Sequence, residues 1–275
     1  MPYARYRWLK IALALSVAVV AGFVATFAPS GYQLEHSGGT LFGYATGTLG
    51  AVLTIWLTLI GIRKRAMTSG SWMLKAWVSA HVYLGLSLAV IVTLHSGFQF
   101  GWNVHTLAYF LMMAVILSGA FGVVMYLRLP RRLSESREET TQKQMLEMIN
   151  SLDRRLHDAA QPLDVEQAAV VQLSLEKTRI GGSLWQRLTR RYRTCGTRRA
   201  TARLPRLRRD ARAEQAAALE QIAGLLEQKS VVLAKARHYI QLRALLEVWL
   251  YVHVPATFAL LAALTAHIVS VFFYW

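Results

Sequence analysis

The sequence has a single cysteine, Cys195, and little charge for its 275 residues. One cysteine excludes an internal disulfide, a multi-cysteine zinc site and an iron–sulfur cluster held by this chain alone. The absence of a Cys-x-x-Cys-His motif excludes covalently attached c-type haem. Only 17% of the residues are charged, against about 25% in an average soluble protein, and 54% are hydrophobic. A wholly soluble globular enzyme is therefore excluded.

Five apolar runs are long enough to cross the ~30 Å hydrocarbon core of a bilayer as helices. They lie at about 9–28, 44–62, 77–97, 106–127 and 246–274. The first run is longer than the hydrophobic region of a typical signal peptide, so we expect it to be retained. We therefore expect an all-α integral membrane protein, a five-helix transmembrane bundle. Residues 1–127 form spans one to four, 128–244 a basic cytoplasmic helical hairpin inserted between spans four and five, and 245–275 the fifth span.

Positive charge alternates between the connections. Arg5, Arg63, Lys64, Arg65 and Lys75 flank the N-terminus and the second connection, whereas the first and third connections contain no Lys or Arg. By the positive-inside rule the N-terminus is cytoplasmic and the C-terminus is outside. We expect the chain to lie in a bacterial cytoplasmic membrane.

The polar segment has two amphipathic patterns. Apolar residues recur at helical spacing from Met145 through Met148, Ile149 and Leu152 to Leu156, and again from Leu219 to Ile240, where the pattern runs into the fifth span. Between them, residues 187–209 contain ten arginines and no acid. Three interpretations compete for this arginine tract: a solvated or lipid-facing loop, a docking surface for an acidic redox partner, and, least favoured, a nucleic-acid site. Cys195 within it is expected to be an incidental thiol.

The histidines of spans three and five have a duplicated spacing. His81 and His95 are 14 residues apart, as are His253 and His267. Fourteen residues advance a helix by about four turns and about 21 Å, so both members of each pair share one face. Because spans three and five run parallel, His81 and His253 lie at one depth, near the inner face, and His95 and His267 near the outer.

Intramembrane ionisable residues are costly and usually functional. Two imidazoles at one depth can hold a planar macrocycle between them, and ligation on both sides suits electron transfer better than oxygen binding. The alternative is four structural histidines hydrogen-bonded to neighbouring helices. His36 and His105 are expected to be ordinary interfacial residues, although they lie where they could touch a propionate, a quinone or an acceptor. The Gly43–Gly47 pair and the Ser-Gly-Ala-Phe-Gly run from Ser118 are expected to serve helix packing.

The doubled His-x13-His resembles that of respiratory and photosynthetic cytochrome b. Its placement on the third and fifth helices is similar to the ferric-reductase-like transmembrane domain. The resemblance implies two b-type haems, ligated by His81 with His253 and by His95 with His267. It covers the five spans and does not extend to 128–244. No G-x-G-x-x-G or P-loop occurs, so the flavin and nicotinamide region of ferric reductases has no counterpart here.

The resemblance implies a dihaem b-type subunit that carries electrons between a cytoplasmic donor and an outer acceptor, within an oxidoreductase complex. The expected partners are membrane lipid and a soluble redox protein: a ferredoxin, a flavoprotein or a c-type cytochrome. Two alternatives stay open. One is a cytochrome b subunit coupled to quinone, and the other is a non-redox membrane anchor or scaffold that assembles partners through its coiled hairpin.

Overall fold

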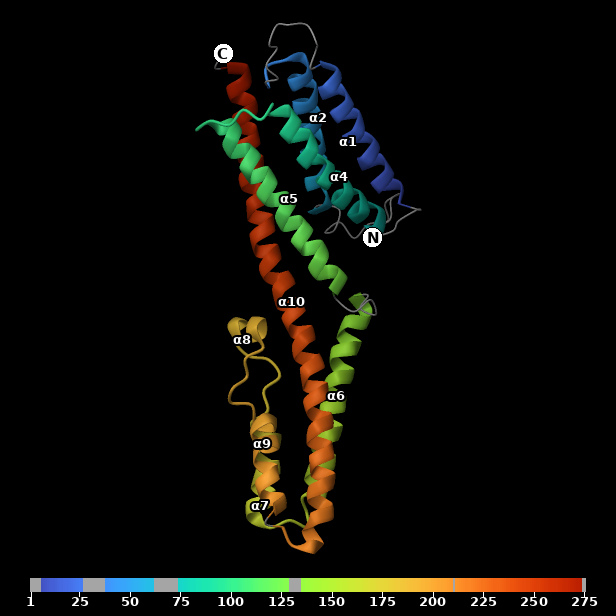
Figure 1. The fold of residues 1–275 in the computed structure, drawn as a ribbon, viewed down its shortest axis with the longest axis vertical. Helices are drawn as coiled ribbons and strands as arrows, with labels where there is room; N and C mark the ends of the chain where they lie inside the picture. Colours follow the sequence, from blue (N-terminus) through green and yellow to red (C-terminus); the bar gives the residue numbers. More distant parts are fainter. Residues whose placement is uncertain (1–5, 27–37, 62–73, 129–134, 210, 274–275) are drawn as a thin grey trace. The chain divides into compact units, whose positions relative to one another are not determined.

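The computed structural model describes residues 6–26, 38–61, 74–128, 135–209 and 211–273, and its regular structure there is entirely helical. The helices are α1 (Arg7–Thr26), α2 (Leu41–Thr58), α4 (Leu74–His95), α5 (Val104–Arg128), α6 (Glu135–Ala159), α7 (Val165–Glu176), α8 (Leu184–Thr189), α9 (Gly196–Arg209) and α10 (Ala213–Phe273) (Figure 1). The sequence expectations for Arg5, His36, Arg63, Lys64 and Arg65 lie outside the described residues.

Five of these helices, α1, α2, α4, α5 and α10, are long and apolar enough to cross a membrane. They coincide with the five apolar runs of the sequence, which confirms the all-α class and the number of candidate spans. A helix is the expected form of such a run, because it satisfies its own backbone hydrogen bonds where no water is available. The continuation of the last polar helix into the fifth apolar run is also confirmed, since α10 is one helix of 61 residues.

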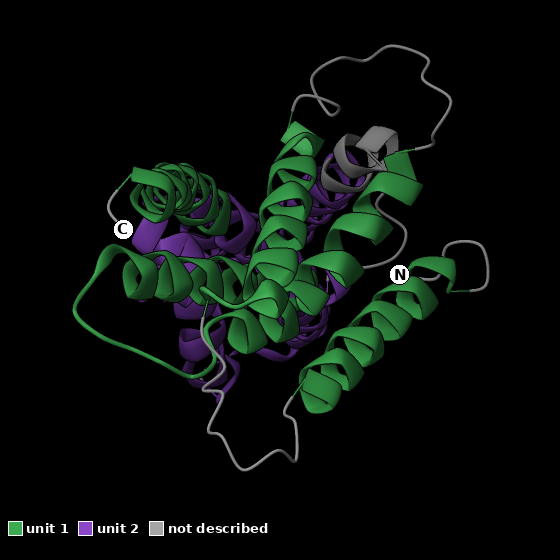
Figure 2. Ribbon diagram, turned by 90° about the horizontal axis from the view of Figure 1, so that it is seen from above, with its two compact units in different colours: residues 1–124, 249–275 green, residues 125–248 purple. Residues whose placement is uncertain are grey.

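The chain divides into two compact units (Figure 2). The first contains residues 1–124 and 249–275, and the second contains residues 125–248. In the first unit α4 packs against α1 and α2. One side of α4 is closed by Ala80, Leu84, Leu88 and Ile91, all nearly inaccessible to solvent, and Leu260 of α10 belongs to the same buried cluster.

The second unit has its own apolar core, formed by Leu156, Val171, Ala200, Ile222 and Leu226 from α6, α7, α9 and α10. The amphipathic pattern of the sequence is confirmed at Leu156 and at residues 219–236, but Met148 is exposed.

The arginine tract is helical in part. Residues 187–189 end α8, residues 190–195 connect it to α9, and α9 packs against α7. The buried residues Thr197, Ala200 and Leu204 follow one face of α9, while its arginines occupy the exposed face. The tract therefore belongs to a folded unit with one buried and one charged side.

A buried cation lies within the second unit. Lys229 is completely buried, forms an ion pair with Asp153, and donates from Nζ to the carbonyl oxygen of Ser174 at 2.9 Å and to its hydroxyl at 3.2 Å. A buried ammonium ion is costly unless it is paired and hydrogen-bonded. Asp153 and Ser174 thus tie α6 and α7 to α10.

We predict that Asp153→Ala destabilises the second unit by about 3 kcal/mol, because it leaves a buried charge without its counterion. Cys195 is buried in the same unit, so the rate at which a thiol reagent labels it in detergent reports the opening of the unit. We expect labelling to be about a hundredfold faster. Glu220→Ala, which removes only an exposed ion pair with Arg208, is the control, and its effect should be below about 1 kcal/mol. Equal labelling rates in the two variants would contradict the account.

Candidate functional site

Histidines of α4 and α10 come together within the first unit. The ring centroids of His95 and His267 are 6.0 Å apart, with the ring planes nearly perpendicular at 87°. This contact is the pairing that the duplicated spacing predicts for these two residues. His81 of α4 and His253 of α10 are each held by a neighbouring helix.

The two histidines of α4 are held by α2. His81 Nδ1 lies 3.0 Å from the carbonyl oxygen of Leu57, and His95 Nδ1 lies 2.8 Å from the carbonyl oxygen of Gly43. A carbonyl oxygen only accepts hydrogen bonds, so each Nδ1 must carry the proton. Each Nε2 is then left with a free lone pair. Leu57 and Gly43 are themselves 14 residues apart, so the spacing on α4 is matched on α2.

The glycines of α2 make room for the His95 ring. A Cβ atom at Gly47 would lie 2.6 Å from His95 Cε1, which is too close for a real side chain. Gly43 supplies the carbonyl oxygen that holds the ring from the preceding turn. The pair thus lies where α2 packs against α4, as the sequence predicts, and the side chain that it contacts is His95.

His253 of α10 is held by α5. Its Nδ1 lies 2.6 Å from the hydroxyl of Ser118, and that hydroxyl donates its only hydrogen to the carbonyl oxygen of Val115 at 2.8 Å. With the Ser118 hydrogen directed to Val115, the Ser118 oxygen accepts from His253, which puts the proton on Nδ1 once more. Trp249 stacks near the ring, with centroids 5.2 Å apart, and its Nε1 donates to the Ser118 carbonyl oxygen at 2.7 Å.

The small residues around Ser118 also serve these aromatic rings. A Cβ at Gly119 would lie 3.5 Å from His253 Cε1, and one at Gly122 would lie 2.4 Å from Trp249. The run thus serves helix packing, as the sequence predicts, and the α10 side chains that it packs against are Trp249 and His253.

The fourth histidine has a histidine partner. His267 Nδ1 makes a short hydrogen bond with His105 Nδ1 of α5, and the ring centroids are 4.6 Å apart. One proton is shared between these two nitrogens. Nε2 of His267 keeps its lone pair in the tautomer in which His267 donates that proton to His105. From the sequence we expect His105 to be an ordinary interfacial residue, but in the structure it is the side chain that holds His267.

An apolar layer separates the two pairs. Leu88 lies seven residues from both His81 and His95, and Leu260 lies seven residues from both His253 and His267. Both leucines are 2% exposed and belong to one buried cluster. The two histidine pairs are therefore distinct sites, about 21 Å apart along α4.

The donor set fits a planar group that brings its own equatorial ligands. Among the residues that the structure describes, no three His, Cys, Asp or Glu side chains gather as a site for a bare metal ion. With metal–imidazole bonds of about 2.0 Å, two nitrogens on opposite sides of one ion are about 4 Å apart and their ring centroids about 6 Å apart. The His95–His267 separation of 6.0 Å agrees with that arrangement.

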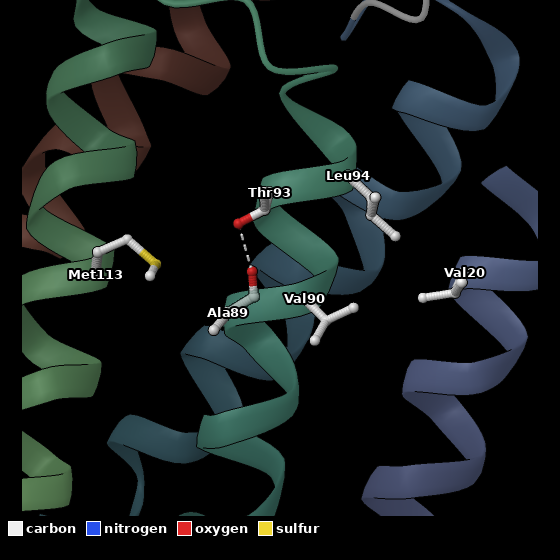
Figure 3. A pocket seen from close by; sticks show the side chains of 6 residues that line it. All are labelled: Val20, Ala89, Val90, Thr93, Leu94 and Met113. Atoms are coloured by element: carbon white, nitrogen blue, oxygen red, sulfur yellow. Dashed lines mark hydrogen bonds between the residues drawn. The ribbon is translucent and has the colours of Figure 1, made fainter. Parts of the chain in front are cut away.

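A shallow apolar hollow lies on another part of α4 (Figure 3). It is lined by Val20, Ala89, Val90, Thr93, Leu94 and Met113. The α4 residues among these lie on the helix face opposite to His81 and His95, at 100° per residue. The Thr93 hydroxyl already donates to the Ala89 carbonyl oxygen at 2.7 Å. The Thr93 hydroxyl also lies 3.2 Å from the hydroxyl of Tyr109. The hollow is separate from the histidine pairs.

Cys195 immediately precedes α9 and is 1% exposed. Burial by itself would raise the pKa of this thiol, but the backbone N–H groups of Arg198 and Arg179 and the guanidinium of Arg237 together lower it. Arg237 Nη2 donates to Sγ at 2.9 Å and also to the Arg179 carbonyl oxygen. Cys195 therefore acts as a hydrogen-bond acceptor that fixes the start of α9.

No protein family, curated protein or solved structure matches this chain.

We predict that ¹⁵N NMR of selectively labelled histidines finds His81, His95 and His253 with the proton on Nδ1 at neutral pH. Gly47→Ala should disturb the His95 signal alone, because the new Cβ displaces that ring. Gly50→Ala is the matched control on the same helix, since its Cβ would meet Val92 only at an ordinary 3.7 Å. A proton on Nε2 of His81 or His95 would show that the α2 carbonyl oxygens do not set the tautomer.

Proposed function

We propose that this chain is the electron-carrying membrane subunit of an oxidoreductase complex, with two haem b groups. His81 and His253 would hold one haem, and His95 and His267 the other. One observation carries the proposal: each of the four histidines is engaged at Nδ1 by a neighbouring helix, and the carbonyl oxygens that face His81 and His95 leave Nε2 of these two rings for a ligand. Metal-ligating histidines commonly donate their second N–H to a carbonyl oxygen or another protein group in this way.

The residues of the chain orient the ligands and exclude water. Leu57, Gly43, Ser118 and His105 fix the four rings, and Trp249 covers the side of His253. A haem supplies one-electron chemistry at its iron when bound. Imidazoles from two helices would hold the group on both sides, which favours electron transfer over oxygen chemistry. Leu88 and Leu260 provide the low-dielectric layer between the two sites.

The five apolar helices would span a bacterial cytoplasmic membrane with the N-terminus inside and the C-terminus outside. The supporting observation is the charge pattern of the connections, in which Lys and Arg accumulate on one side. The second unit, residues 125–248, would then be cytoplasmic. Electrons would pass between a cytoplasmic donor and an acceptor on the outer side.

The exposed face of α9 suits a soluble, acidic donor such as a ferredoxin or a flavoprotein. Arg198, Arg199, Arg203 and Arg206 lie on it. At the start of α9, Cys195 accepts a hydrogen bond from Arg237 of α10, and at its end Arg208 pairs with Glu220 of α10. Arg237 and Glu220 are 10 and 27 residues before Glu247 in the sequence. Along a helix these separations are about 15 and 40 Å. Both exceed the Debye length of about 8 Å, so most of this face is too far from a lipid surface to respond to its charge.

We predict that the purified chain is red and has the spectrum of b-type haem with paired imidazole ligands. His81→Ala and His253→Ala should lose one spectral component, and His95→Ala and His267→Ala the other, since each haem loses one of its two protein ligands. His157→Ala and His238→Ala, exposed histidines of the second unit, are the controls and should keep both components. Full haem content in all four ligand variants would overturn the assignment.

We predict that reduction of the haems by reduced flavodoxin, an acidic donor used as the probe, slows at least tenfold between about 10 mM and 300 mM salt. Arg199→Glu with Arg203→Glu should slow it at low salt, because the charge that steers the encounter is reversed. Arg154→Glu with Arg155→Glu, on α6, is the matched control with the same change in net charge. A rate independent of salt, or equal loss in both variants, would contradict docking at α9.

A further inference from the structure

We propose that α8 is a membrane-surface anchor that binds anionic phospholipid headgroups. The inference rests on the membrane orientation proposed above but not on the haems. It begins with two large apolar side chains that face solvent in the second unit: Leu184 is 46% exposed and Trp185 is 69% exposed. Both lie in the first turn of α8.

The position of α8 along α10 indicates where Leu184 and Trp185 lie relative to the proposed membrane. Arg187 Nη1 lies 3.9 Å from Glu247 Oε2, and Gln241 Nε2 donates to the Leu188 carbonyl oxygen at 2.6 Å. Glu247 is the last charged residue before the apolar stretch of α10, residues 248–273. The short helix therefore lies beside the part of α10 that would emerge from the membrane. Leu184 and Trp185 are then at the level of the lipid headgroups.

The chemistry around α8 fits that level. Tryptophan is enriched where membrane meets water, because its ring is apolar and its N–H is polar. Arg190, Arg191 and Arg193 follow directly, are exposed, and have no acidic residue between positions 177 and 209 to neutralise them. Exposed apolar side chains next to arginines are typical of segments that lie in the interface of an anionic membrane. An acidic protein would pair with the arginines but gives no reason for an exposed Trp185 beside the last charged residue of α10.

Local structure holds this turn rigid. Ser183 and Gln186 form a reciprocal capping box at the start of α8, and Arg190 ends the helix in the left-handed conformation at φ 55°. Because the turn is fixed at both ends and tied to α10, Leu184 and Trp185 are displayed without a further ordering cost on binding.

The test places a nitroxide spin label at Leu184→Cys in the full chain, which leaves Trp185 in place. Cys195 is buried, so the unsubstituted chain serves as the labelling blank. Val165→Cys is the matched control: Val165 is 90% exposed at the start of α7. The preceding residue, Asp164, accepts from Gln215 Nε2 at 2.9 Å. Gln215 is 32 residues before Glu247, or about 48 Å along a helix.

The chain is reconstituted in nanodiscs of phosphatidylcholine alone or with one third phosphatidylglycerol. The accessibility of each label to oxygen, which concentrates in lipid, is compared with its accessibility to a water-soluble nickel chelate. We expect the oxygen-to-nickel ratio at 184 to be several-fold above that at 165, and to rise further with phosphatidylglycerol. A label at 184 as accessible to nickel as the label at 165 would overturn the anchor.

A second pair of variants tests the anionic headgroups. Replacing Arg190, Arg191 and Arg193 with Gln should abolish the increase caused by phosphatidylglycerol, while replacing Arg198, Arg199 and Arg203 with Gln should preserve it. Headgroup binding would be overturned if the oxygen-to-nickel ratio still rises with phosphatidylglycerol after Arg190, Arg191 and Arg193 are replaced. It would also be overturned if the ratio does not rise in the protein that keeps all its arginines. Haem absorbance is recorded on the same discs. Colourless discs with a lipid-embedded label at 184 would contradict the proposed function but support the anchor. Red discs with a water-exposed label at 184 would support the proposed function but contradict the anchor.

Discussion

An imidazole N–H among apolar helices must find a hydrogen-bond acceptor, because leaving it unpaired costs several kcal/mol in the absence of water. In the first unit this requirement decides which helix faces meet. Two backbone carbonyl oxygens of α2 serve His81 and His95, and two side chains of α5 serve His253 and His267. Helices α2 and α5 therefore act as the frame that orients the ligands presented by α4 and α10.

The glycines follow from the same constraint. A carbonyl oxygen reaches Nδ1 of a ring on the next helix only if the ring can lie flat against that helix, and Gly47 provides the space for His95. Gly119 does so for His253, and Gly122 for Trp249. The leucines midway along α4 and α10 then fill the interval between the two pairs. Two separate sites with paired imidazoles have three requirements. Each ring must be oriented by a hydrogen bond at Nδ1, glycines must leave space for the ring, and an apolar layer must separate the two pairs.

The features that could be predicted from the sequence are those that come from a repeated pattern of residues. Apolar runs predicted five long helices, and the 14-residue spacing predicted that His95 of α4 would face His267 of α10. The sequence was insufficient where a role depends on the partner. A Gly-x-x-x-Gly pair predicts close packing but does not say that the neighbour is the His95 ring, and the role of His105 depends on a partner 162 residues away. The helix α9 was missed because its sequence is dominated by arginine and contains Pro205, which draws attention away from the amphipathic spacing of Thr197, Ala200 and Leu204.

The central claim is that four Nε2 atoms are available as two pairs of axial ligands. The most direct measurement is the number of b-type haems per chain in the unsubstituted protein, by haem extraction and protein quantification, together with the spin state of the iron by electron paramagnetic resonance. The account predicts two haems per chain, both low-spin, as two imidazoles on one iron require. A chain that takes up no haem on reconstitution with hemin, or that binds it as high-spin iron with one axial ligand, would contradict it.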